Sequence, residues 1–217
     1  MRDGAQAVDR ACALLNAFSP ERPVLGLKEL ATIVGINKST AHRLLGAMCA
    51  AGLVLQDPKT HEYAPGMRLV VLGNVALARM DIARIAMPAM TRLAAAVRET
   101  AYLATYAEHG AAYLAVAEGP RTIRLTAHVG MVLPLHSTAT GKVLLAALSK
   151  EEVAKRLPRT LPRLTPKTVT KAALGRELKR VQQQGYAISY DEHEVGICSI
   201  AVAIRDDTGV IAALAVS

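Results

Sequence analysis

Hydrophobic residues near the start of the chain recur at helical spacing. Apolar side chains at three- and four-residue intervals predict two amphipathic helices, over residues 5–18 and 27–34. Gly35 then indicates a turn, after which a third helix with an apolar stripe is predicted to end near Gly52. The candidate caps of this third helix are Asn37, Ser39 and Thr40.

Two short extended segments follow, on either side of a proline-containing turn. The segment "LVLQ" precedes the turn "DPKTH", and "EYAPG" follows it. This order predicts a β-hairpin directly after the third helix. Apolar spacing over residues 66–84 then predicts a helix that connects this block to the rest of the chain.

From residue 89 the pattern mixes strands and helices. A helix over 89–99 precedes three expected strands, "TAYLATYA", "AAYLAVAE" and "RTIRLTAHV". Helices are expected at "STATGKVLLAALS", beginning near Ser137, at "KEEVAKRL", and at "TKAALGRELKRVQQQG", which Thr170 caps and Gly185 ends. The remaining residues predict strands with "DDTG" as a hairpin turn. An antiparallel sheet with helices follows, and the chain as a whole is expected to be an α+β protein of two domains.

Composition narrows the class of protein. The 217 residues are 52% hydrophobic, which is ample for a packed core. No stretch supplies the roughly 20 apolar residues of a membrane helix, and the N-terminus lacks the apolar segment of a secretory signal. We therefore expect a cytoplasmic protein without membrane contact, with its three widely spaced cysteines as reduced thiols.

Charge alone does not identify a DNA-binding region. The formal net charge is +8, but residues 1–80 hold nine Lys and Arg against six Asp and Glu. The order of helices and hairpin is more informative, because it matches a winged helix-turn-helix, whose recognition helix lies in the major groove. The third helix begins with a polar end, "NKSTAHR", that offers donors to phosphates and bases. The candidate DNA contacts, with the hairpin as the wing, are Lys38, Ser39, Thr40, His42, Arg43, Lys59 and His61. A plain structural or protein-interaction module is the alternative.

Five blocks in register resemble the IclR family of bacterial transcriptional regulators. They are "AVDRACALLNAF", "LGLKELATIVGINKSTAHRLLGAM", "GLVLQDPKTHEYAPGMRLVVLG", "PLHSTATGKVLLA" and "GYAISYDEHEVGICSIAVAI". The resemblance implies a DNA-binding domain over 1–65, a linker helix over 66–84 and a GAF-like effector-binding domain over 85–217. It also implies double-stranded operator DNA and a small carboxylic acid as partners, and a homodimer or homotetramer. Family members usually continue into a final helix after "AALAVS", so we expect that helix to be missing.

The N-terminus of the helix predicted at Ser137 is a candidate anion site. Backbone N–H groups and the helix dipole favour a carboxylate at such an end, and Ser137 and Thr138 are candidate caps. By resemblance, this segment and the last strands, aligned on Gly196, form two walls of an effector pocket. The expected pocket residues are Ser137, Thr138, Ala139, Thr140, Gly141, Ser189, Ser199, Ala215 and Ser217. The alternative is a well-capped helix with a packing glycine and nothing bound.

Many family members have cysteine where Ser199 stands. Because strand neighbours face opposite sides, only one of Cys198 and Ser199 is expected to enter the pocket, and we choose Ser199. Its hydroxyl donates to a carboxylate more strongly than a thiol does. Candidates for an apolar lining, or for ordinary core, are Met131, Leu133 and Leu125.

Other chemistries have less support. The run "DEHE", residues 191–194, contains metal-ligand residue types and could combine with His128 or His136, but a solvated loop is the expectation, with no metal and no cofactor. No nucleophile elbow, phosphate loop or dinucleotide fingerprint is present, so we expect no enzyme. The expected function is a DNA-binding transcriptional regulator modulated by a small organic or aromatic acid. The alternative is a ligand sensor or protein-interaction module without sequence-specific DNA binding.

Overall fold

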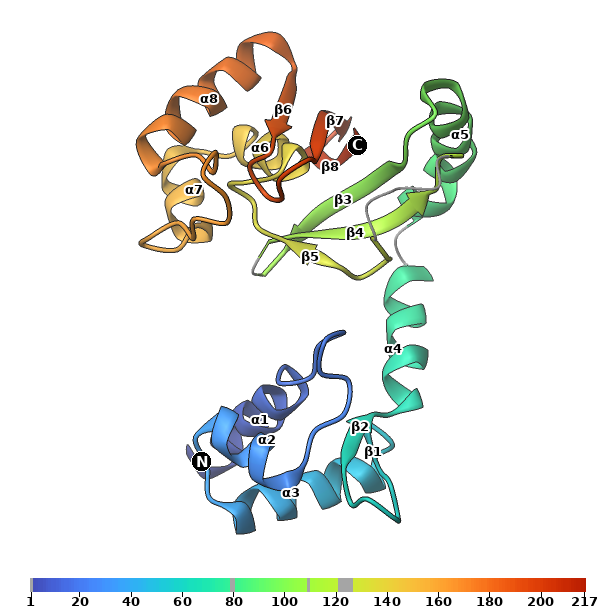
Figure 1. Ribbon diagram of the computed structural model, residues 1–217, viewed down its shortest axis with the longest axis vertical. Coiled ribbons are helices and arrows are strands. Elements are labelled where there is room, and N and C mark those ends of the chain that lie inside the picture. The colour runs from blue at the N-terminus through green and yellow to red at the C-terminus, as the bar shows by residue number, and fades with distance from the viewer. Residues whose placement is uncertain (1, 79–80, 109, 121–126) are drawn as a thin grey trace. The chain divides into compact units, whose positions relative to one another are not determined.

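The computed structural model describes residues 2–78, 81–108, 110–120 and 127–217 (Figure 1). The chain divides into two compact units, Met1–Arg79 and Met80–Ser217, and each is described separately. Among the described residues, no helix is both long and apolar enough to cross a membrane.

The first unit contains three helices and a hairpin in the predicted order. Its elements are α1 (Arg2–Leu15), α2 (Leu27–Val34), α3 (Lys38–Ala50), β1 (Val54–Gln56), β2 (Tyr63–Pro65) and α4 (Met67–Ala78). The helix expected over 66–84 differs, because α4 is described to Ala78 and residues 81–84 belong to α5 (Asp81–Val97) of the second unit. Gly35 ends α2 in the left-handed conformation, at φ 69°, which glycine adopts without strain. Of the three candidate caps of α3, Asn37 is the one that caps it.

The core of this unit joins all three helices to the hairpin. Leu14, Leu30 and Leu45 are completely buried, one from each helix, and they pack with Val54 and Tyr63 from the two strands. Antiparallel pairing of β1 with β2 places Val54 opposite Pro65. The unit is therefore a trihelical bundle closed by a two-stranded sheet.

The second unit is built on a six-stranded antiparallel sheet in the order β5-β4-β3-β8-β7-β6. Its strands are β3 (Ala101–Ala107), β4 (Gly110–Ala117), β5 (Val132–Leu133), β6 (Tyr186–Tyr190), β7 (Cys198–Asp206) and β8 (Gly209–Val216). Its helices are α5 (Asp81–Val97), α6 (Ala139–Ala146), α7 (Lys150–Arg156) and α8 (Lys171–Gln184). The expected α+β class is confirmed.

Three details of the second unit differ from the predictions. The helix expected over 89–99 begins earlier, at Asp81, because the helix includes Pro88 rather than starting after it. The strand expected over 121–129 falls mostly outside the described residues, and its described part, 127–129, is not in a strand. The two-residue strand β5 was not predicted, since two residues are too few for an alternating pattern.

Helix α6 is the centre of this unit. It packs against β6, β7, β8 and α8, and every one of its residues is buried. Alanines at positions 187, 201, 213 and 215 face this core, so the helix lies close to the sheet. Thr138 caps α6, and Thr170 and Gly185 cap and end α8 as the sequence predicts.

Candidate functional site

The polar end of α3 is exposed on one face while its apolar stripe is buried. Ala41, Leu45 and Met48 lie in or against the core of the first unit. The side chains of Lys38, Ser39, His42 and Arg43 are exposed, and that of Thr40 is half-buried. The first turn of the helix contains no acidic residue. This end of α3 therefore presents a group of hydrogen-bond donors and positive charge to solvent.

Asn37 fixes the start of α3. Its side-chain oxygen accepts a hydrogen bond from the amide of Thr40 at 2.8 Å and one from the Ser39 hydroxyl at 2.9 Å. A cap of this kind stabilises a helix by about 0.5–2 kcal/mol. The cap and the buried stripe together hold the exposed residues on a rigid helical frame.

The hairpin that follows is also fixed in place. Asp57 accepts hydrogen bonds from the amides of Lys59, at 2.7 Å, and Thr60, at 3.0 Å, which closes the turn. These two bonds hold the pKa of the Asp57 carboxyl below its usual value. Lys59 and His61 are exposed at this turn. Their positions are those expected of a wing.

A small cavity lies in the second unit beside the N-terminus of α6. Its lining residues are Tyr113, Leu133, Thr138, Ala139, Thr140, Ser189, His193, Ile197, Ser199, Ala215 and Ser217. They come from β4, β5, β6, β7, β8, the start of α6 and the segment between β6 and β7. The space available to the centre of a water molecule is ≈ 20 Å³, about enough for one water.

Seven of the nine expected pocket residues line this cavity. They are Thr138, Ala139, Thr140, Ser189, Ser199, Ala215 and Ser217. Ser137 lies behind the lining, where its carbonyl accepts a hydrogen bond from the Ser189 hydroxyl at 2.8 Å. Gly141 is not in the lining either, because a Cβ at this position would overlap the backbone of Leu135. Gly141 is therefore the packing glycine that the alternative interpretation describes.

Hydrogen-bond donors converge on the cavity. Thr138 accepts from the amide of Gly141 at 3.1 Å, and the first intrahelical bond of α6 runs from the amide of Lys142 to the Thr138 carbonyl at 3.0 Å. The amides of Ala139 and Thr140 precede that bond, so the helix itself does not need them. An anion at this end would receive both amides and the positive end of the helix dipole.

A pair of serines lies on the opposite side of the cavity. The Ser217 hydroxyl donates to the Ser199 hydroxyl oxygen at 2.8 Å. This bond uses the proton of Ser217, so Ser199 can direct its own proton at a ligand. Cys198, the neighbour of Ser199, is exposed, as expected for the other face of the strand.

The sequence did not identify three of the lining residues, Tyr113, His193 and Ile197. The Tyr113 ring stacks on that of Tyr102, with 5.0 Å between ring centroids. His193 is half-buried, with Nδ1 3.4 Å from the Ser137 hydroxyl. Burial lowers the pKa of His193, which Glu194 raises and His136 lowers further. The imidazole is therefore neutral at pH 7.

The prediction of a solvated loop at residues 191–194 is wrong for Glu192. This carboxylate is buried and contacts the completely buried ammonium of Lys142 at 2.5 Å. Lys142 also reaches Glu177 at 2.6 Å and the carbonyl of Ile188 at 3.1 Å. Burial of a lysine requires such partners, and they attach this segment to α6.

The described residues do not support the metal site considered at residues 191–194 with His128 or His136. Among these described residues, no three His, Cys, Asp or Glu side chains gather where they could hold a metal. Leu133 lines the cavity and Met131 packs against the core, whereas Leu125 lies outside the described residues.

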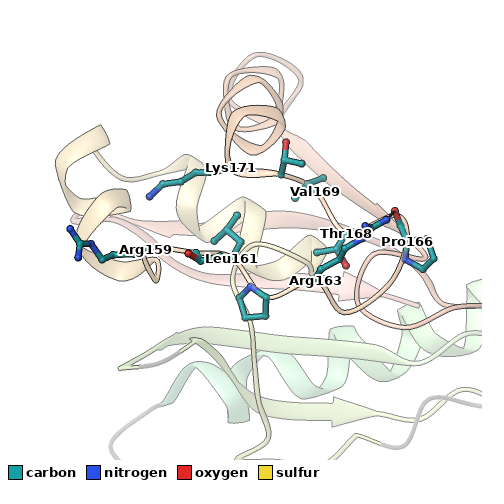
Figure 2. A pocket seen from close by; sticks show the side chains of 10 residues that line it. Arg159, Leu161, Arg163, Pro166, Thr168, Val169 and Lys171 are labelled. Carbon is teal, nitrogen blue, oxygen red and sulfur yellow. Dashed lines mark hydrogen bonds between the residues drawn. The ribbon is translucent and has the colours of Figure 1, made fainter.

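A larger surface pocket, with a volume of ≈ 480 Å³, is lined by the segment that joins α7 to α8 in the sequence. Three cations line it, but Figure 2 shows Arg159 and Lys171 directed to one end and Arg163 to the other. The Arg163 guanidinium is bonded to the carbonyls of Thr165 and Pro166. The three charges therefore do not converge on one ligand, and we assign no site there.

Comparison with known families covers nearly the whole chain. Residues 7–58 match the IclR helix-turn-helix domain, and residues 74–217 match the bacterial transcriptional regulator IclR C-terminal domain. The chain is 36% identical over 213 residues to the HTH-type transcriptional regulator KdgR of Dickeya chrysanthemi, covering 97% of this chain and 70% of that protein. It is 33% identical over 217 residues to the HTH-type transcriptional repressor AllR of Salmonella typhi, covering 99% and 80%.

Solved structures agree in fold. An IclR transcriptional regulator from Alicyclobacillus acidocaldarius matches with a TM-score of 0.84 at 27% identity, covering 97% of this chain and 86% of that chain. An IclR homologue from Microbacterium hydrocarbonoxydans, complexed with 4-hydroxybenzoate, matches with a TM-score of 0.82 at 29% identity, covering 96% and 87%.

Proposed function

Because the chain belongs to the IclR family of bacterial transcriptional regulators, we propose that α3 is the helix that reads its operator. The observation that carries this proposal is the exposed polar end of α3, which Asn37 caps and the core holds in place. With α3 in the major groove, its exposed polar residues contact phosphates or base edges; these residues are Lys38, Ser39, Thr40, His42 and Arg43. Lys59 and His61 of the wing contact the adjacent backbone.

We propose that the cavity beside α6 binds a small organic acid. The amides of Ala139 and Thr140 receive its carboxylate, and Ser199 donates its free proton to it. The apolar body of the acid contacts Leu133, Tyr113 and Ile197. The 4-hydroxybenzoate bound by the Microbacterium homologue supports an aromatic acid as the ligand.

We further propose three functional regions. Residues 1–65 bind DNA, residues 66–84 link the two domains, and residues 85–217 bind the effector. We also propose a homodimer or homotetramer. Large apolar side chains of α4 are exposed in the single chain, which favours burial against another copy; they are Met67, Val70, Val71, Leu72 and Val75.

We propose that the protein is a regulator without catalytic activity that acts on DNA in the cytoplasm. Ser137 and His193 lie 3.4 Å apart, a pairing of hydroxyl and imidazole that also occurs in hydrolases. Ser137 is nevertheless completely buried and is not among the residues that line the cavity. The names of the matched relatives are those of regulators and repressors.

Salt-dependent DNA binding tests the first proposal. Purified protein is titrated onto DNA from upstream of its own gene and onto unrelated DNA of equal length. We expect Arg43→Ala to weaken operator binding by about 1–3 kcal/mol if Arg43 reads a base, or to weaken all sequences alike with a shallower salt slope if it contacts phosphate. Arg180→Ala, which removes the same charge from an exposed position on α8, is the control and should bind as the unaltered protein does.

Two results would count against the recognition helix. Equal affinity of Arg43→Ala and Arg180→Ala would remove Arg43 from the interface. Absence of binding to both DNAs at low salt would favour the alternative, a ligand sensor or protein-interaction module.

A further inference from the structure

The cavity beside α6 must enlarge before an organic acid can enter. Its ≈ 20 Å³ holds about one water molecule, whereas an aromatic acid has many times that volume. Most of the wall is rigid. Helix α6 is buried throughout, and Ser189, Ser199 and Ala215 lie on strands paired within the six-stranded sheet. The side chain that moves must therefore come from elsewhere in the lining.

The segment between β6 and β7 supplies His193 and Ile197, and its backbone is also clamped. The carbonyl of Glu192 accepts from the Thr168 hydroxyl at 2.7 Å, and that of Asp191 accepts from the Thr165 hydroxyl at 2.6 Å. The Glu192 carboxylate contacts Lys142. Three side chains, those of Thr165, Thr168 and Lys142, thus hold the two residues that precede His193.

The ring of His193 is held much less firmly than its backbone. Its 3.4 Å separation from the Ser137 hydroxyl is longer than the usual 2.7–3.2 Å of a hydrogen bond to nitrogen. The ring is half-buried, so rotation toward solvent removes little packing. The His193 ring is therefore well placed to rotate while the clamped backbone stays in place.

The groups around His193 favour protonation only when an anion is present. Glu194 lies on its own segment, and His136 precedes α6. Tyr113 of β4 lines the same cavity, and the Lys142–Glu192 pair lies beside the segment on the α6 side. Burial of the ring and, to a smaller extent, His136 hold the pKa of His193 below its usual value and so favour the neutral form. A carboxylate at the N-terminus of α6 would add a negative charge close to the ring, and an opposite charge at this distance favours imidazolium.

Building on the proposed effector function, we propose that His193 is the gate of the cavity and the cationic partner of the effector carboxylate. As the acid binds, the ring rotates toward solvent to admit it and then turns back over the carboxylate. There it takes up one proton from solvent and donates a hydrogen bond to the carboxylate, which stays ionised throughout. Selectivity follows from this arrangement. Carboxylates bind with proton uptake, whereas neutral analogues such as the corresponding amides gain nothing from the imidazolium.

Calorimetry with 4-hydroxybenzoate tests this role. Titration between about pH 6 and about pH 8, in buffers of different ionisation enthalpy, gives both the Kd and the number of protons taken up. We expect uptake approaching one proton per site, and a Kd that rises up to about tenfold per pH unit on the alkaline side. His193→Gln should bind more weakly near pH 6, without proton uptake and with a Kd that does not change with pH. His128→Gln, a matched change at an exposed histidine of the same unit, should behave as the unaltered protein does.

A second measurement does not depend on any variant folding correctly. Histidine ring signals followed by NMR in the unaltered protein should show the pKa of His193 rising when 4-hydroxybenzoate is added. Binding without proton uptake, with an unmoved pKa, would overturn the role of His193 while leaving acid binding intact. Failure of 4-hydroxybenzoate, benzoate and lactate all to bind would overturn acid binding itself and this role with it.

Discussion

Ser199 shows how a single residue can define the chemistry of the cavity. It accepts a hydrogen bond from Ser217 at 2.8 Å and so has its own proton to donate. Cys198 precedes it on the same strand but faces the other side of the sheet. The two neighbouring positions therefore differ in environment while sharing a backbone, which makes them a matched pair for substitution.

Ser199→Leu should abolish binding of an acid effector and leave operator binding unchanged. The larger apolar side chain fills a cavity of ≈ 20 Å³ and removes the free donor. Calorimetry with 4-hydroxybenzoate measures the first effect and fluorescence anisotropy with operator DNA the second. Cys198→Leu is the control and should bind both. Undiminished acid binding by Ser199→Leu would exclude this residue from the pocket.

Residues that line the cavity could be predicted from the sequence where a local pattern, such as a helix cap or strand alternation, fixes their place. Thr138 is a helix cap, and Ser189 and Ser199 follow from strand alternation combined with a family resemblance. Tyr113 was not predictable, because it reaches the cavity through the packing of β4 beside β3, a long-range arrangement that no local pattern encodes. His193 lies in the "DEHE" run, whose charged residues suggested solvent exposure.

At the scale of elements, α6 is in close contact with the segment that precedes it. A Cβ at Gly141 would overlap the backbone of Leu135, so glycine is required by space rather than by backbone conformation. Gly175, on the exposed side of α8, has nothing within 4 Å of the same position. The two glycines therefore respond differently to the same substitution.

Gly141→Ala should lower the free energy of unfolding of the second unit by about 1–3 kcal/mol, since the added methyl group overpacks a rigid contact. Gly175→Ala should raise it by about 0.5–1 kcal/mol, because alanine is the better helix former where space is available. Urea-induced unfolding followed by circular dichroism compares them. Equal stability of the two variants would contradict the packing described for α6.

Helices with strong local signals were predicted well. Gly35, Thr170 and Gly185 act as the stop and cap residues that their types indicate. The burial of Lys142 was not predicted, because lysine is rarely buried. Its partners, Glu177 and Glu192, come from distant parts of the chain. The helix that carries Lys142 was predicted from local pattern, but the burial of Lys142 and its ion pairs depend on tertiary contacts that no local pattern encodes.

At the scale of the whole molecule, we propose that the two units bind different ligands. In this proposal the first unit presents the polar end of α3 to DNA, and the second binds a carboxylate in the cavity beside α6. If the acid changes operator affinity, thermodynamic linkage requires that operator changes acid affinity by the same factor. Because the chain belongs to a family of transcriptional regulators, this coupling between acid binding and operator binding is the property that matters most for its function.

Operator affinity measured with and without saturating 4-hydroxybenzoate tests that claim most directly. Fluorescence anisotropy at fixed salt gives the Kd for operator DNA in both states, and calorimetry confirms that the cavity is occupied. We expect the Kd to change by about 5–150-fold, which corresponds to a coupling free energy of about 1–3 kcal/mol, and to stay constant for Ser199→Leu. An unchanged operator Kd in protein shown to be saturated with acid would contradict regulation by this ligand site.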